Sequence, residues 1–142
     1  MRYAPDGQHI AAIRTPDDTT TFPAGALWLV DSNGKHARFA AIADGGRGMF
    51  PVWSQDGEKI AFIGRNHPDD SDSINLSILT LSGFTPAIFD IKPLLPPVWA
   101  ADGKGVYVTL AAGDKMDVWF YEIATQTSQK MFENACCAGW IK

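Results

Sequence analysis

The sequence has few of the residues on which metal and redox chemistry depend. Its 142 residues include two cysteines and three histidines. Cys136 and Cys137 are neighbours, so they lack the Cys-x-x-Cys spacing of a zinc site, and a bond between them would require a distorted peptide. We therefore expect no metal and no cofactor, and either two free thiols or a pairing with another segment.

Positive charge is also scarce. Lysine and arginine number 12 against 16 aspartates and glutamates, and no basic cluster offers a surface for a phosphate backbone. No apolar stretch approaches the about 20 residues of a membrane-spanning helix, and no basic-then-apolar leader stands at the start. The sequence therefore predicts no nucleic-acid partner and no membrane span. Its 46% of hydrophobic and 20% of charged residues are typical of a globular domain.

What the sequence does contain is one segment that occurs three times. Each copy has an aromatic residue, an Asp-Gly pair that starts three residues later, and a β-branched residue four positions after the aspartate. Asp-Gly favours a tight reversal between two strands, because glycine readily takes the positive φ that such turns require. A fourth pair, Asp44-Gly45, lacks both flanking residues and is predicted to lie in a loop. The copies occupy residues 3–10, 53–60 and 99–106.

Apolar runs of strand length follow each turn. The first runs cover residues 10–13, 60–63 and 106–110, the second 26–30, 74–81 and 118–123, and the weaker outer runs 37–41, 86–89 and 129–132. Even spacing indicates one unit used three times, and runs that are apolar at successive positions need cover on both faces. The prediction is an all-β chain of three four-stranded antiparallel units, at about residues 1–50, 51–96 and 97–142.

A family resemblance lies in residues 51–62, which read PVWSQDGEKIAF. This segment resembles the blade signature of the TolB-type, WD-repeat-like β-propellers, which reads roughly P-x-W-S-P-D-G-K-x-I-A-F. Residues 97–104 are similar, with alanines for the Ser and the Pro, and residues 3–7 keep the Pro but have Tyr for Trp. The resemblance implies a partial propeller of three blades, a scaffold for binding, and a periplasmic or other extracytoplasmic location.

Three blades do not close a ring, because propellers typically have about four to eight. Trp140 stands 41 residues after Trp99, where the first strand of another blade would begin. Either the chain is a fragment of a longer protein, or two copies complete a six-bladed ring in which Trp140 of one chain pairs with the opening blade of the other. In both cases we expect the isolated chain to self-associate, because unfinished blade surface drives association.

The tryptophans are predicted to be core residues. Trp53 and Trp99 end inner strands, where a large ring fills the space between blades, and Trp28 and Trp119 lie in middle strands. We expect all four to pack between blades rather than to form a stacking platform.

Catalytic residues are not predicted in this chain. No Gly-x-Ser-x-Gly elbow is present, and the histidines have no evident Ser or Cys partner. They lie at different places in the repeat, and we expect solvated side chains for His9, His36 and His67.

The candidate site is a face formed by acidic loops. The loops between the second and third strands, predicted over residues 15–25, 64–73 and 111–117, emerge opposite the Asp-Gly turns and share their face with the connections between units. Loops on a rigid scaffold commonly carry recognition, whereas a solvated rim that keeps the domain soluble is the alternative. Calcium bound at residues 69–72 is a third interpretation, although the EF-hand spacing is missing. The candidate residues are Asp17, Asp18, Arg47, Asp69, Asp70, Asp72, Asp114 and Asp117.

The function predicted from these features is a non-catalytic binding or scaffolding module for a protein or peptide partner. The alternative is the gating propeller of a prolyl-oligopeptidase-type serine peptidase whose hydrolase domain lies outside this chain. A purely structural piece without a ligand is a third possibility.

Overall fold

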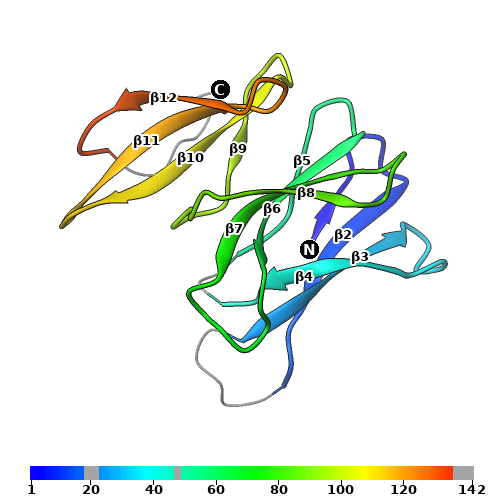
Figure 1. The fold of residues 1–142 in the computed structure, drawn as a ribbon. Coiled ribbons are helices and arrows are strands. Elements are labelled where there is room, and N and C mark those ends of the chain that lie inside the picture. The colour runs from blue at the N-terminus through cyan, green and yellow to red at the C-terminus, as the bar shows by residue number, and fades with distance from the viewer. Residues whose placement is uncertain (18–22, 47–48, 136–142) are drawn as a thin grey trace.

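The computed structural model describes residues 1–17, 23–46 and 49–135. These residues form twelve β-strands (Figure 1), and no helix among them is long and apolar enough to cross a membrane. Unit 1 contains β1 (Arg2–Tyr3), β2 (His9–Arg14), β3 (Ala24–Asp31) and β4 (Arg38–Asp44). Unit 2 contains β5 (Val52–Trp53), β6 (Lys59–Arg65), β7 (Ile74–Thr80) and β8 (Pro86–Phe89). Unit 3 contains β9 (Val98–Trp99), β10 (Gly105–Ala112), β11 (Lys115–Glu122) and β12 (Thr127–Phe132).

Each unit is an antiparallel sheet whose strands pair in chain order. One further pair, Ala43 with Gly64, joins β4 to β6 and so links the sheets of units 1 and 2. The short first strands lie together, because β5 contacts both β1 and β9 (Figure 1). The predicted all-β architecture of four-stranded antiparallel units is confirmed.

Several predicted boundaries are wrong. The loops predicted over residues 15–25 and 64–73 are shorter, because β3 already starts at Ala24 and β6 runs to Arg65. The outer strand predicted over residues 37–41 continues to Asp44, which is fully buried and belongs to β4 rather than to a loop. The loop predicted over residues 111–117 is a tight hairpin, because β10 runs to Ala112 and β11 starts at Lys115. Gly113 allows this hairpin by taking a φ of 67°.

The three Asp-Gly turns have the same geometry, and the prediction of positive φ at their glycines is confirmed. Gly7, Gly57 and Gly103 have φ of 70°, 73° and 68°. In the second turn, the Gly57 N–H donates to the Ser54 carbonyl over 3.0 Å, and Asp56 accepts the Glu58 N–H over 2.9 Å. The Ser54 hydroxyl and the Glu58 N–H hold the pKa of Asp56 below its ordinary value.

Replacing Gly57 with valine should lower the free energy of unfolding by about 1–3 kcal/mol, because a β-branched residue is strained at positive φ. Gly83 provides the control, since it does not have a positive φ and an added Cβ there meets nothing within 4 Å. Urea unfolding of both valine variants measures the difference. Equal losses at the two positions would contradict the strain.

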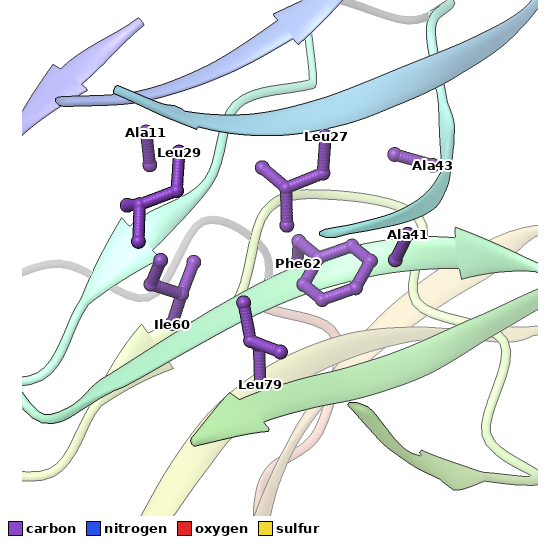
Figure 2. Packing of buried hydrophobic residues seen from close by; sticks show 8 residues of the cluster. All are labelled: Ala11, Leu27, Leu29, Ala41, Ala43, Ile60, Phe62 and Leu79. Atoms are coloured by element: carbon purple, nitrogen blue, oxygen red, sulfur yellow. The ribbon is translucent and has the colours of Figure 1, made fainter. Parts of the chain in front are cut away.

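The core consists of two clusters, one on each side of unit 2. The first joins units 1 and 2 and is shown in Figure 2, where Phe62 of β6 faces Leu27 and Ala41 of unit 1. The second joins units 2 and 3 around Val108 and Tyr121, whose ring meets Phe89 edge-on at a centroid distance of 5.2 Å. The strands β6 and β7 are therefore buried on both faces, as the continuous apolar runs predicted.

Trp53 and Trp99 form equivalent hydrogen bonds, each of which joins two consecutive units. The Trp53 indole N–H donates to the Arg2 carbonyl over 3.1 Å, and the Trp99 indole N–H donates to the Val52 carbonyl over 2.9 Å. Arg2 and Val52 hold equivalent places in units 1 and 2, because each immediately precedes the aromatic residue of its repeat. Trp99 is 4% exposed, which confirms the prediction, whereas Trp53 is only half-buried.

The two tryptophans of the middle strands differ. Trp119 packs against the second cluster, as expected. Trp28 does not lie between described units: its ring points away from unit 2 and meets Phe39 edge-on at a centroid distance of 6.0 Å. The reason is its register, because Leu27 and Leu29, its neighbours along β3, occupy the face that packs on unit 2.

Candidate functional site

The candidate face carries the connections β2–β3, β6–β7 and β10–β11 together with the connections between units. Antiparallel pairing places all of these at the end of the sheets opposite the Asp-Gly turns. Asp18 and Arg47 lie outside the described residues, as do Cys136, Cys137 and Trp140. Among the predicted candidate residues, those found exposed are Asp17, Asp69, Asp70, Asp72 and Asp114.

The β6–β7 connection, residues 66–73, is the best-defined loop of this face. Ser73 is at its centre. The carbonyls of His67 and Asp70, each 2.8 Å from the Ser73 hydroxyl, share its single proton, and the hydroxyl oxygen accepts the His67 N–H over 3.1 Å. The Asp70 carboxylate accepts the Asp72 N–H over 2.8 Å. These bonds fix the backbone, so the exposed carboxylates of this loop project from an ordered frame.

A buried ion pair anchors this loop across the boundary between units 1 and 2. Arg65, the last residue of β6, donates through Nε to Asp44 Oδ1 over 3.0 Å and also through a terminal nitrogen to the same oxygen. Both side chains are almost completely buried. The other terminal nitrogen of Arg65 donates to the Pro68 carbonyl over 3.2 Å. One guanidinium therefore connects the end of unit 1 to the acidic loop of unit 2.

Asp117 was predicted to lie on the loop face, but it belongs to β11 and is 6% exposed. Its carboxylate pairs with the Lys130 ammonium over 3.0 Å and accepts the Asn134 N–H over 3.0 Å. The contacts with Lys130 and Asn134 hold the pKa of the Asp117 carboxyl below its ordinary value. The hydrogen bond to Asp117 in turn raises the pKa of Lys130. Asp117 therefore links β11 to the edge strand β12 through Lys130 and to the segment after β12 through Asn134.

Replacing Asp117 with asparagine should make the melting temperature fall less as the pH is lowered. A carboxyl whose folded-state pKa lies below the ordinary 3.8 stabilises the fold at pH values above 3.8, and this contribution disappears as the pH falls through the folded-state pKa. The variant should therefore melt below the native chain at neutral pH and converge with it in acid. Melting temperatures measured from about pH 7 to about pH 2 test this. Asp114→Asn is the exposed control, and parallel curves for Asp117→Asn and the native chain would contradict the pairing.

Two of the hollows on the candidate face bear on recognition. One, of about 340 Å³, is lined by Phe50, Val52, residues 95–98 and Thr109, where β5 and β9 begin. The Arg2 guanidinium lies over the Phe50 ring at 4.3 Å. The other hollow, of about 560 Å³, has Asp17 and Pro68 among its lining residues, so the acidic loops of units 1 and 2 adjoin there.

Comparisons with known proteins identify the fold. No family model matches this sequence, and no curated protein matches it. Among solved structures, the putative TolB of Agrobacterium tumefaciens covers 92% of this chain with a TM-score of 0.69 and 16% identity, over 44% of its own length. TolB of Acinetobacter baumannii covers 88% with a TM-score of 0.64 and 20% identity, over 30% of its own length. A prolyl endopeptidase covers 94% with a TM-score of 0.70 and 15% identity, over 21% of its own length.

This chain has the fold of a TolB-type β-propeller, in three blades. Units 1, 2 and 3 are its blades, and β1, β5 and β9 are their innermost strands. The chain spans less than half the length of each of these matching structures.

The described ranges show no cluster of metal-ligating side chains. No group of three or more His, Cys, Asp or Glu side chains there could hold a metal ion, and residues 69–72 form no such group. His36 pairs with Asp31 over 2.6 Å, and His9 lies 3.9 Å from the same carboxylate. His36 and His67 are exposed and His9 is half-buried, so the expected solvation is correct for two of the three.

Sequence reasoning missed Asp44 and Arg65, which position the acidic loop. Asp44 was recognised only as an Asp-Gly pair without the flanking pattern of the blade turns. The missing flanking pattern was the sequence signal for a buried Asp44. An aspartate that forms no turn and follows an apolar strand needs a partner for its charge. Arg65 directly follows the apolar residues 60–63 and Gly64, and a cation at the end of a fully buried strand also needs a partner.

Proposed function

We propose that this chain is a non-catalytic binding module whose propeller blades hold a protein or peptide partner on the loop face. The observation that carries the proposal is the ordered acidic loop of blade 2. Exposed loops usually lose conformational freedom when they bind, which weakens the complex. Here the loop is already fixed by its own hydrogen bonds and by Arg65, so binding requires little further ordering.

The chemistry of the face defines the partner. The carboxylates of Asp69 and Asp72 are exposed and favour basic side chains. The hollow lined by Phe50 and residues 95–98 is mainly apolar, which suits one aliphatic or aromatic side chain. A partner segment with an apolar anchor and flanking lysine or arginine therefore fits this face best.

A peptide selection tests the proposal. The full chain is immobilised, a random peptide library is panned on it, and the dissociation constants of the selected peptides are measured by calorimetry. We expect basic residues near an apolar residue in the selected sequences. An exposed charge contact is worth up to about 1 kcal/mol, so Asp69→Lys should weaken binding about fivefold.

Glu58→Lys is the matched control, because Glu58 is also exposed but lies at the Asp-Gly turn on the opposite face. Both substitutions change the net charge by the same amount. A library that yields no binder, or binders weakened equally by both substitutions, would reject the loop face as the binding site.

A second candidate is the propeller portion of a serine peptidase, with the hydrolase domain elsewhere in the protein. The likeness to a prolyl endopeptidase over nearly the whole chain supports it. The sequence of the surrounding gene distinguishes the two functions. A downstream Gly-x-Ser-x-Gly elbow in a hydrolase domain would favour the peptidase, and further blades alone would favour the binding module.

A further inference from the structure

The chain contains two boundaries between consecutive blades, and the repeat allows their residues to be compared position by position. Equivalent positions are found by counting from the glycine of each Asp-Gly turn and by following the strand register. Both boundaries have an apolar cluster and an indole hydrogen bond, from Trp53 to the Arg2 carbonyl or from Trp99 to the Val52 carbonyl. They differ in the contacts that surround this common core.

The buried ion pair at the boundary of blades 1 and 2 cannot form between blades 2 and 3. Arg65 is the eighth residue after its turn glycine, and Ala111 is the eighth residue after the turn glycine of blade 3. The register of the outer strands matches Asp44 with Lys92. Lysine and alanine cannot replace the pair, and Lys92 and Ala111 are both exposed.

Two contacts between an arginine and an aromatic ring also join blade 1 to blade 2. The Arg2 guanidinium lies 4.3 Å from the centroid of the Phe50 ring, and the Arg38 guanidinium lies 3.7 Å from that of Phe84. The equivalent residues between blades 2 and 3 have neither a positive charge nor an aromatic ring, so these contacts cannot form there. They are Val52 for Arg2, Pro96 for Phe50, Ala87 for Arg38 and Gln126 for Phe84.

The backbone differs in the same direction. Ala43 and Gly64 pair and continue the sheet of blade 1 into blade 2. Their equivalents are Ile91 and Leu110, but β8 already ends at Phe89, and among the described residues blade 3 forms a sheet of its own (Figure 1). Hydrogen bonds fix the direction in which two blades meet, because they depend on angle, whereas apolar contact has no direction.

We propose that blade 3 is a hinged element that tilts on blade 2, whereas blades 1 and 2 move as one rigid body. The hydrogen bond from Trp99 to the Val52 carbonyl joins the innermost strands and serves as the pivot. Farther out, apolar side chains such as the rings of Phe89 and Tyr121 meet across the boundary. Apolar side chains can slide past each other without leaving a buried polar group unpaired, so a tilt has a low cost.

The hollow of about 340 Å³ on the loop face spans this hinge. Phe50 and Val52 stand at the start of blade 2, and residues 95–98 stand at the start of blade 3. A tilt of blade 3 therefore changes the width of the hollow. The hinge itself depends only on the two boundaries and not on the proposed function.

Distances between spin labels test the hinge. Nitroxides are attached to cysteines introduced at equivalent exposed positions of the three blades, in a chain whose Cys136 and Cys137 are replaced with serine. Double electron–electron resonance then gives the distribution of distances between neighbouring blades. We expect the distribution from blade 2 to blade 3 to be at least about 2 Å wider than that from blade 1 to blade 2. The labelled positions are Asn33, Ser82 and Ala124.

Transplanting the ion pair should restrain blade 3. Lys92→Asp with Ala111→Arg introduces the residues of the first boundary at the second and should remove most of the excess width. Lys92→Asp alone is the matched control and should leave the distribution wide, because it lacks the arginine. Conversely, Asp44→Leu with Arg65→Met removes the ion pair and should widen the distribution from blade 1 to blade 2. Far-ultraviolet circular dichroism verifies that each variant is folded.

Equal widths at the two boundaries of the labelled native chain would overturn the proposal. A transplanted pair that leaves the distribution between blades 2 and 3 unchanged would overturn it too. So would an equal narrowing with Lys92→Asp alone, or a distribution between blades 1 and 2 that stays narrow when both Asp44 and Arg65 are replaced.

Discussion

Replacing Arg65 with methionine should lower the free energy of unfolding by about 3–5 kcal/mol. Methionine keeps most of the apolar stem but removes the guanidinium, and the Asp44 carboxylate then stays buried without that cation. The β6–β7 loop also loses the bond from Arg65 to the Pro68 carbonyl. Urea unfolding followed by tryptophan fluorescence measures the loss.

The double variant Asp44→Leu, Arg65→Met separates burial of charge from loss of packing. An apolar pair of similar volume removes both charges, so most of the loss should be recovered. Lys35→Met is the exposed control and should change stability by less than about 0.5 kcal/mol. A loss below about 1 kcal/mol for Arg65→Met alone would show that the pair is not essential to the boundary between blades 1 and 2.

Replacing Trp99 with alanine should cost about 3–5 kcal/mol, because its ring is buried between blades 2 and 3. The substitution also removes the indole N–H that bonds the Val52 carbonyl. Urea unfolding gives the loss. Trp99→Phe keeps an aromatic ring and should cost less, mainly the net worth of one hydrogen bond and some packing, about 1–2 kcal/mol.

Trp53→Ala is the matched comparison, because Trp53 makes the equivalent bond to Arg2 but is only half-buried. Its loss should be smaller than that of Trp99→Ala, since less apolar surface returns to water. Equal losses would indicate that the bond between blades, rather than burial, determines the stability of this position.

The fold could be predicted because its strongest determinants are local in the sequence. An Asp-Gly pair with an aromatic residue before it and a β-branched residue after it specifies a turn within a few residues, and the φ of Gly57 confirms this. The continuous apolar run of β6 likewise predicted cover on both faces. Repetition then extended this local information from one blade to three.

The candidate site was less predictable, because its key contacts join residues far apart in the chain. Asp44 is bonded to Arg65 of the next blade, and no local pattern reports such a pairing. Asp117 follows Asp114 in an acidic segment, but the tight turn at Gly113 places Asp117 within β11, where its side chain is buried. The sequence also did not predict the side of the sheet on which Trp28 lies. Neighbouring residues of a strand face opposite sides, so a shift of one residue in β3 would exchange Trp28 with Leu27.

The burial of β6 and β7 on both faces has a consequence for how stability is distributed along the chain. Blade 2 owes its cover to two neighbours, whereas each end blade shares a described interface only with blade 2. In a linear array of this kind, stability is set largely by the interfaces between units rather than by any unit alone. Unfolding of blade 1 or blade 3 therefore exposes one apolar face of blade 2 to water. We expect the three blades to unfold together in one cooperative transition.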